Sequence, residues 1–219
     1  MRTLAKLAVA FGLTICLSSA ANAQGPGGRG MGGGGGINLL TNKSVQKELK
    51  LTDEQIEKAT KAATEMREKM TEKRQELQGL EGEEMAAIQK EMGVESKKLT
   101  DAILKPEQTK RLEQITLQQS GFRAFATPDV QSKLKFNDEQ KNKIKDLSDE
   151  AQGQMRELFQ SAQGGGDRAE MMKKMTELNK QNNEKALAVL TAEQKKAWKE
   201  LTGEPFTIVQ EQGRRPGGN

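Results

Sequence analysis

The sequence predicts an all-α protein built from two tandem units of long antiparallel helical hairpins. A short phrase typical of a helix start occurs four times, as LTDEQ at Leu51, LKPEQ at Leu104, FNDEQ at Phe136 and LTAEQ at Leu190. The first and third copies stand 85 residues apart, and the second and fourth stand 86 apart. Such a constant offset indicates an internal duplication. Apolar residues at intervals of three and four follow each copy, as in amphipathic helices.

The first 23 residues have the pattern of a secretory signal peptide. Arg2 and Lys6 precede a short apolar run, and Ala21 to Ala23 form a small-residue cleavage site. We expect cleavage after Ala23 and therefore a periplasmic or otherwise exported protein. The single Cys16 lies inside the apolar run, so the exported chain has no disulfide and depends on packing for its stability. No other apolar run approaches the roughly 20 residues of a membrane span.

Glycine-rich segments flank the helical part of the chain, and neither can bury enough apolar surface to become ordered. Between them, Gly36–Gln55 aligns without a gap on Gly121–Gln140. Glycines at Gly79, Gly82 and 164–166 are expected to form the turns of the hairpins. We therefore divide the chain into a signal peptide (1–23), a disordered leader (24–36), a first helical unit (37–120), a second helical unit (121–206) and a disordered tail (207–219).

Each copy of the phrase has the residues needed to start a helix. In the first copy, the Thr52 hydroxyl is expected to accept a hydrogen bond from the Gln55 amide, while the Gln55 side chain reaches back to the Thr52 amide. A helix of about 25 residues should follow. The second copy has Lys105 at the cap, but Pro106 suits a first helical position. The predicted helix-start residues are Leu51, Thr52, Gln55, Leu104, Gln108, Phe136, Asn137, Gln140, Leu190, Thr191 and Gln194.

The composition argues against an enzyme. The chain has no histidine and no tyrosine, and the exported part has no cysteine, so the usual proton shuttle and thiol nucleophile are missing. Carboxylate pairs such as Glu83/Glu84 and Asp149/Glu150 are more typical of a solvated helix face. We expect no catalytic residue and no cofactor. Zinc, which prefers histidine and cysteine ligands, is not expected either.

The charge pattern argues against nucleic acid as a partner. The chain has 35 basic and 31 acidic residues, and both signs are interspersed. Such a pattern indicates a solvated, salt-bridged helix surface rather than a basic footprint. Aromatic residues amount to 3% of the chain, which leaves few platforms for base stacking.

L-T-x-x-Q phrases on exported helical hairpins resemble the Spy/CpxP family, also called LTXXQ-motif proteins. The resemblance covers nearly all of 44–201, as two family-like units in tandem. It implies an all-helical periplasmic protein, often a dimer with a curved, cradle-like shape. It further implies binding of unfolded or misfolded envelope proteins without ATP, or restraint of an envelope-stress sensor. Two departures stand out: typical members have one unit, and zinc-responsive relatives use His or Cys ligands that this chain lacks. An intramolecular pair is therefore an alternative to a homodimer.

Methionine is the residue type from which a binding surface is predicted, because its flexible, polarizable side chain adapts to varied apolar partners. Two other interpretations stay open. Methionines at helical spacing commonly pack the core between helices, and the thioethers of the MMKKM segment could take Cu(I). The residues of the predicted client-binding surface are Met66, Met70, Met85, Met92, Met155, Met171, Met172 and Met175.

We therefore predict an exported, non-enzymatic binding protein that holds non-native envelope proteins or modulates an envelope stress response. One alternative is a helical oligomerisation or assembly protein of the cell envelope. A second is a metal-responsive, methionine-based periplasmic binder. The polar stretch Glu177–Lys185 interrupts the apolar stripe, which favours a polar binding patch, a weakly ordered turn or a hinge. Trp198 is expected to pack against the hairpins.

Overall fold

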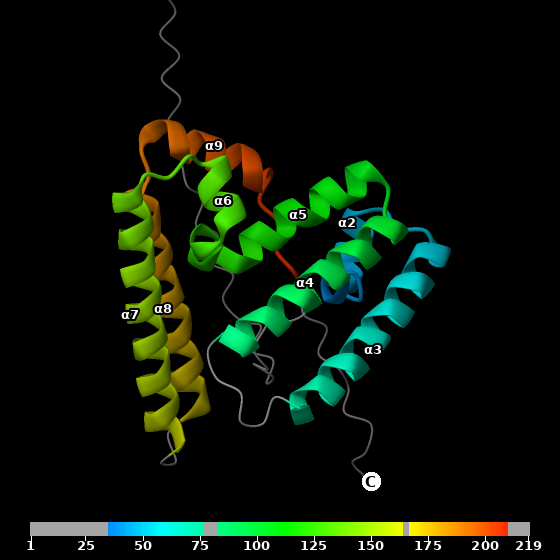
Figure 1. The fold of residues 1–219 in the computed structure, drawn as a ribbon, viewed down its shortest axis with the longest axis horizontal. Coiled ribbons are helices and arrows are strands. Elements are labelled where there is room, and N and C mark those ends of the chain that lie inside the picture. The colour runs from blue at the N-terminus through cyan, green and yellow to red at the C-terminus, as the bar shows by residue number, and fades with distance from the viewer. Residues whose placement is uncertain (1–34, 77–82, 164–166, 210–219) are drawn as a thin grey trace, which may run out of the picture. The chain divides into compact units, whose positions relative to one another are not determined.

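The computed structural model describes residues 35–76, 83–163 and 167–209 (Figure 1). Within these ranges every regular element is helical and no strand occurs, which confirms the predicted all-α class. The predicted signal peptide and the glycines expected at the hairpin turns lie outside the described residues. In chain order the elements are α1 (Gly35–Leu39), α2 (Lys43–Glu48), α3 (Asp53–Glu76), α4 (Glu83–Ile103), α5 (Pro106–Ser120), the 3-10 helix η1 (Gly121–Ala126), α6 (Pro128–Lys133), α7 (Asp138–Gln163), α8 (Arg168–Val189) and α9 (Ala192–Thr202).

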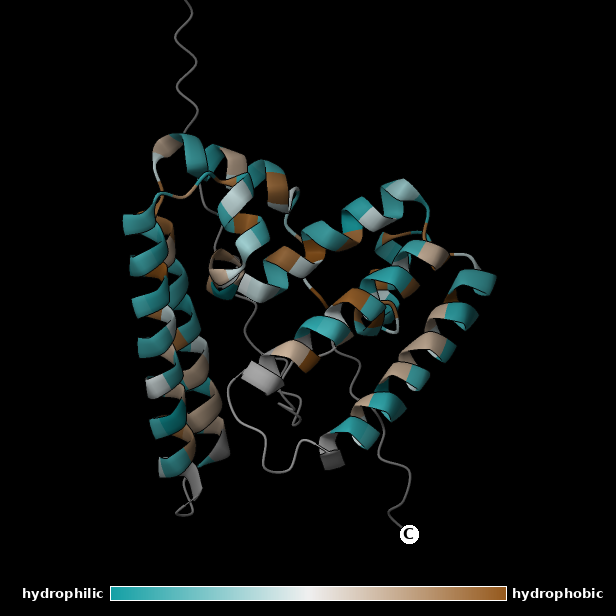
Figure 2. Cartoon of the chain, in the orientation of Figure 1, coloured by the Kyte–Doolittle hydropathy of each residue, from teal (hydrophilic) through white to brown (hydrophobic). Residues whose placement is uncertain are grey.

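The four copies of the repeated phrase stand directly before α3, α5, α7 and α9. The helices that follow the first and third copies contain 24 and 26 residues. In the second half of the chain, α7 and α8 lie side by side (Figure 1). Hydrophilic and hydrophobic residues alternate along both of these helices (Figure 2), as amphipathic helices require.

Short helices that the sequence analysis did not predict supply much of the buried core. In α1, the turn after it and α2, Ile37, Leu40 and Val45 respectively have no exposed surface. In η1 and α6, Phe125 and Val130 are each 1% exposed. Elements of five or six residues are too short to show a helical period in the sequence. Their apolar side chains nevertheless anchor the long helices.

Buried apolar side chains gather in two clusters, one in each half of the chain. The first core cluster consists of Ile37, Leu39, Leu40, Val45, Leu49, Ala59, Ala62, Ala63, Met66, Met92, Leu104, Leu112 and Ile115. The second core cluster consists of Phe122, Ala124, Phe125, Val130, Leu134, Phe136, Ile144, Leu147, Ala151, Ala186 and Leu190. Trp198 packs against the second cluster, with its ring centroid 4.4 Å from that of Phe125.

The segment after α9 returns to the first half of the chain. Phe206 and Ile208 pack against the first core cluster. The Val209 amide donates to Ser44 Oγ at 3.1 Å, and Asn42 Nδ2 donates to the Val209 carbonyl at 2.9 Å. Residues 207–209 are therefore held in place, and their assignment to a disordered tail was wrong. At the other edge, α1 already includes Gly35 and Gly36 of the predicted leader.

The same backbone turn precedes the first and third copies of the phrase. Lys50 and Lys135, which are 85 residues apart, have φ values of 50° and 52°. In each case the next amide donates to a carbonyl five residues back, at 3.0 Å and 2.9 Å. Such bonds satisfy carbonyls left free at a helix end, at the cost of a left-handed residue.

The polar stretch Glu177–Lys185 lies inside α8, so the turn and hinge interpretations of it were wrong. Asn182 is only 3% exposed. A Cβ atom at Gly121 would lie 2.8 Å from Asn183 Oδ1, which shows how closely η1 approaches this part of α8. Asn183 therefore marks a packing contact between the two elements.

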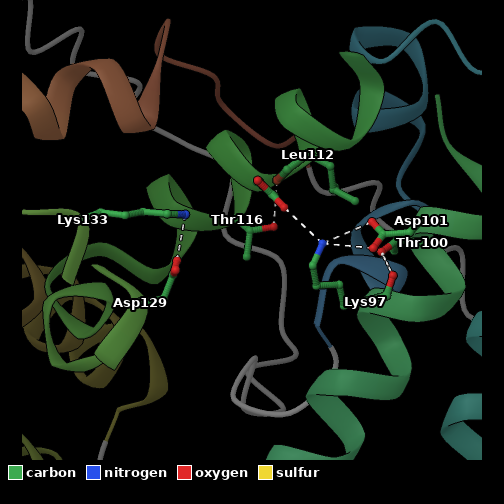
Figure 3. Close-up of polar contacts among 8 residues, drawn as sticks. Lys97, Thr100, Asp101, Leu112, Thr116, Asp129 and Lys133 are labelled. Atoms are coloured by element: carbon green, nitrogen blue, oxygen red, sulfur yellow. Dashed lines mark hydrogen bonds and ion pairs between the residues drawn. The ribbon is translucent and has the colours of Figure 1, made fainter. Parts of the chain in front are cut away.

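An exposed lysine joins α4 to α5. Lys97 Nζ lies 3.1 Å from Asp101 Oδ2 on its own helix (Figure 3) and 3.4 Å from Glu113 Oε1 on α5. The hydrogen bond that Lys97 donates to Asp101, with a further one to Glu113, raises the pKa of Lys97 above its ordinary value, and burial opposes this. A second ion pair in Figure 3, between Lys133 and Asp129, spans one turn of α6 at 2.9 Å. Exposed pairs of this kind contribute little to stability individually.

Candidate functional site

The glutamines of the first two phrases bind each other. Gln55 Nε2 donates to Gln108 Oε1 at 2.8 Å, and Gln108 Nε2 donates to Gln55 Oε1 at 3.3 Å. Each Nε2 also donates to a main-chain carbonyl that stands just before the other glutamine's phrase, Gln55 to Ile103 at 2.9 Å and Gln108 to Leu49 at 3.0 Å. The two carboxamides therefore form a reciprocal clasp between the starts of α3 and α5.

The glutamines of the third and fourth phrases repeat this arrangement. Gln140 Nε2 donates to Gln194 Oε1 at 2.6 Å, and Gln194 Nε2 donates to Gln140 Oε1 at 3.0 Å. Gln140 also donates to the Val189 carbonyl at 3.0 Å, and Gln194 to the Leu134 carbonyl at 3.1 Å. The carbonyls of the second clasp stand 85 and 86 residues after those of the first. We call the two arrangements the first and second glutamine clasps.

Each clasp oxygen also accepts from the backbone at the start of its own helix. The Thr52 amide donates to Gln55 Oε1 at 3.1 Å, and the Gln55 amide donates to Thr52 Oγ1 at 3.3 Å. Lys105 has no acceptor on its side chain, so at the second phrase only its amide takes part, donating to Gln108 Oε1 at 2.9 Å. The amide of the cap residue and the partner glutamine thus share the same oxygen.

The later phrases show the same geometry at the backbone. The Asn137 amide donates to Gln140 Oε1 at 3.2 Å, and the Gln140 amide donates to Asn137 Oδ1 at 2.8 Å. At α9 the Thr191 amide donates to Gln194 Oε1 at 2.9 Å, and the Gln194 amide donates to Thr191 Oγ1 at 3.2 Å.

Clasp formation uses the full bonding capacity of each carboxamide. A glutamine side chain offers two donors and one oxygen with two lone pairs. In Gln140 both donors and both lone pairs have partners. This matters because Gln108 and Gln140 are only 8% exposed, and a buried polar group without a partner is costly. The phrase therefore starts a helix and also forms a tertiary contact, through the hydrogen bonds of its glutamine to the glutamine of another phrase.

The apolar first residues of the phrases reach into the core. Leu104, Phe136 and Leu190 are buried, and Leu51 is half-buried against the first core cluster. Phe136 lies with its ring centroid 6.3 Å from that of Phe125 in a stacked arrangement. The phrase thus combines an apolar residue packed in the core with a clasped glutamine four positions later.

The predicted methionine surface divides between core and partly exposed positions. Met66 and Met92 are buried in the first core cluster, at 2% and 6% exposure, so for them the core interpretation holds. Met70 packs half-buried against the same cluster. The Met85 side chain lies outside the description. Half-exposed positions are occupied by Met155, Met171, Met172 and Met175.

Half-exposed methionines concentrate on the distal part of the α7–α8 hairpin, beyond Ala151 and before Asn182. The residues there whose burial is described include no fully buried side chain. Leu158 is half-buried, and Phe159 is 45% exposed. Among the described residues, α7 and α8 pack on each other here, so the apolar stripe of each helix has the other helix as its partner. We refer to Met155, Leu158, Phe159, Met171, Met172 and Met175 as the distal apolar surface.

Mixed charges border the distal apolar surface. Lys185 pairs with Glu150 across the hairpin at 2.8 Å, and Lys174 pairs with Glu170 at 2.8 Å within α8. The predicted carboxylate pair Asp149/Glu150 is engaged in the same way, since Lys145 lies 2.8 Å from Asp149. The side chains of Glu83 and Glu84 lie outside the description. Within the described ranges, no group of three or more His, Cys, Asp and Glu residues is placed to hold a metal ion.

Sequence reasoning missed the contacts of the C-terminal segment with α5. Gln118 Nε2 donates to the Thr202 and Glu204 carbonyls at 2.7 Å and 2.8 Å, and the Phe206 amide donates to Gln118 Oε1 at 2.8 Å. The Arg111 guanidinium stacks 6.0 Å from the Phe206 ring centroid. The apolar FTIVQ stretch was the available signal, and it binds as irregular chain rather than as a strand.

Comparison with known proteins gives no relative, because no protein family, curated protein or solved structure matches this chain. None of the helices in the described part combines the length and apolar character needed to cross a lipid bilayer.

Proposed function

We propose that the chain is an exported, non-enzymatic binding protein of the Spy/CpxP type, in which two tandem LTXXQ-type hairpin units hold non-native envelope proteins. The tandem interpretation draws support from the two glutamine clasps, whose bonds recur at an offset of 85 or 86 residues. Restraint of an envelope-stress sensor through the same surface is part of this proposal, because a sensor segment would use the same apolar contacts.

The distal apolar surface is the observation that carries the binding proposal. A non-native protein exposes apolar segments of no fixed shape, so its binder needs apolar side chains that can change conformation. Methionine suits this role, because three rotatable bonds and a polarizable sulfur let it fit irregular surfaces. Met171, Met172 and Met175 stay half-exposed along one helix, with Met155 and Phe159 on the facing helix.

The mixed charges beside this surface fit the same role. Pairs such as Lys185–Glu150 present both signs within one region, so polar segments of either charge find a partner there. Exposed pairs are weak and exchange easily with water. A binder built this way holds many sequences loosely, without demanding one of them.

An aggregation assay tests the proposal. The purified full chain should suppress aggregation of reduced lysozyme and of other unfolding proteins at a near-stoichiometric ratio, without ATP. Replacing Met155, Met171, Met172 and Met175 together by Gln should remove most of the suppression, because glutamine keeps the side-chain length but not the apolar surface. Absence of suppression across several client proteins would reject the proposal.

A matched control separates loss of the surface from loss of the fold. Lys173, Thr176 and Glu177 are exposed residues of α8 that neighbour the methionines in the sequence. Replacing these three by Gln should leave both the helical content and the suppression unchanged. Light scattering on the same samples tests assembly: a fixed oligomer that dissociates in the methionine variant, with no suppression by either protein, would assign the surface to self-association.

A further inference from the structure

An open cavity of about 600 Å³ lies between η1 and α7. The α7 residues that line it follow intervals of three, one, three and one, which places them on one face of the helix. Its volume falls in the range of small-molecule sites. The lining residues are Phe122, Arg123, Ala126, Ser148, Ala151, Gln152, Met155 and Arg156.

A small residue at the base of the cavity explains why the space exists. Ala151 is 4% exposed and belongs to the second core cluster. The residue 85 positions earlier, at the corresponding place in α3, is Met66, which is 2% exposed and belongs to the first core cluster. The longer side chain of Met66 occupies space that the small side chain of Ala151 leaves open in the second half. The second half therefore has room for a ligand where the first half has a side chain.

Two arginines, Arg123 and Arg156, line the cavity. Neither Arg123 nor Arg156 forms an ion pair with a carboxylate among the described residues. The Arg123 guanidinium lies over the Phe122 ring, 5.0 Å from its centroid. Stacking uses the face of the guanidinium and leaves its N–H edge free to bind an anion. The cavity thus combines an apolar floor with the two guanidinium groups of Arg123 and Arg156.

The polar groups of the lining favour an acyl chain over a peptide. Ser148 Oγ already donates to the Ile144 carbonyl at 2.8 Å. Phe122, Ala126, Ala151 and Met155 offer no polar side-chain atom, so Gln152 is the one remaining uncharged polar side chain of the lining. A peptide would bring amide groups that need partners on entering this site. An alkyl chain has no such need, and its carboxylate would meet the arginines.

We propose that this cavity binds the carboxylate end of a medium-chain acyl group, with the alkyl chain against Phe122, Ala151 and Met155 and the carboxylate on Arg123 and Arg156. The proposal does not require the client-binding function, although Met155 belongs to both the cavity lining and the distal apolar surface. It requires the cavity and the two guanidinium groups, and the three methionines of α8 do not line that cavity.

Isothermal titration of the full chain with decanoate, below its micellar concentration, tests this proposal. We expect one site with a dissociation constant of the order of 0.1 mM. Decanol should bind at least about tenfold more weakly, because it lacks the charge. Arg123→Gln and Arg156→Gln should each weaken decanoate binding by about tenfold. Arg67→Gln, a change to an exposed arginine of α3, should leave it unchanged.

Ala151→Met supplies a steric test, because it introduces the side chain that α3 has at the corresponding position. This variant should keep the helical circular dichroism and lose decanoate binding. Unchanged binding in folded Ala151→Met would overturn the proposal, as would equal affinity for decanol or the absence of decanoate binding. A short peptide ending in a free leucine carboxylate that binds in place of decanoate would also overturn it.

Discussion

Gln140 and Gln194 hydrogen-bond to each other through both carboxamide groups, at 2.6 Å and 3.0 Å, although 54 residues separate them in the chain. Their clasp joins the start of α7 to the start of α9, on either side of the whole α7–α8 hairpin. Because Gln140 also caps the Asn137 amide, one side chain connects the local start of a helix to the closure of the hairpin. Both the capping of α7 and the contact that closes the hairpin thus depend on Gln140.

Removal of a clasp glutamine should be strongly destabilising. Gln140→Ala leaves the Gln194 carboxamide and the Val189 carbonyl without their partner in a mostly buried site. We expect a loss of about 2–3 kcal/mol in the free energy of unfolding, measured by urea denaturation. Asn142→Ala, which removes an exposed amide side chain from the same helix, should change it by less than about 0.5 kcal/mol.

A double-mutant cycle refines this prediction. If the clasp is a coupled pair, Gln140→Ala and Gln194→Ala together should cost less than the sum of the single variants, by about 1 kcal/mol. Strict additivity would show that each glutamine acts only as a cap of its own helix.

Phe125 should be a principal support of the second core cluster. It is 1% exposed and lies 4.4 Å from Trp198, between ring centroids. Phe125→Ala should lower the free energy of unfolding by about 3–5 kcal/mol and shift Trp198 fluorescence to the red as water enters. Phe159→Ala provides the comparison, because Phe159 is 45% exposed, and its removal should cost less than about 1 kcal/mol. Similar losses in the two variants would contradict this assignment of the core.

Two glycines should respond to alanine with opposite signs. Gly121 has a φ of 54°, and a Cβ there would lie 2.8 Å from Asn183 Oδ1, so Gly121→Ala should destabilise the fold by at least about 1 kcal/mol. Gly153 lies inside α7 with nothing within 4 Å of such a Cβ. Gly153→Ala should therefore stabilise by about 0.5–1 kcal/mol. The thermal unfolding midpoint should fall in Gly121→Ala and rise in Gly153→Ala. A shift of both midpoints in the same direction would be inconsistent with these backbone conformations.

Acid should weaken the first turn of α7. The hydrogen bond and charge of Lys141 lower the pKa of Asp138, and those of Lys143 lower the pKa of Glu139. A carboxyl whose pKa is lowered by folding stabilises the fold above its ordinary pKa, here 3.8 and 4.5, and this contribution disappears as the pH falls through the folded pKa. The thermal midpoint should fall on acidification below about pH 5, and less steeply in Asp138→Asn/Glu139→Gln. Parallel curves for the two proteins would assign acid sensitivity to other carboxylates.

The sequence was informative where a local pattern determines structure. Helical periodicity determined the all-α class, and the repeated phrases stand before four of the long or middle-sized helices. The pairing of Gln55 with Gln108 could not be predicted, because it depends on a contact between segments 53 residues apart. Nor could the sequence separate buried Met66 from half-exposed Met172, since both stand at helical spacing.

Short and irregular segments were the other source of error. Ile37 and Leu40 belong to a helix of only five residues and the turn after it, which no period reveals. Asn182 looked like a break in an apolar stripe, but it lies inside α8 and is only 3% exposed. Phe206 stood beyond the last periodic segment, and its binding site on the first half is created only by the fold.

The packing of Phe206 and Ile208 on a cluster that begins at Ile37 has a consequence for the order in which the molecule matures. The ribosome adds Ile208 171 residues after Ile37. Until then the first half can form its helices but lacks the side chains that cover its core. A nascent chain that has not reached Ile208 therefore leaves this apolar surface exposed to chaperones, proteases or another growing chain.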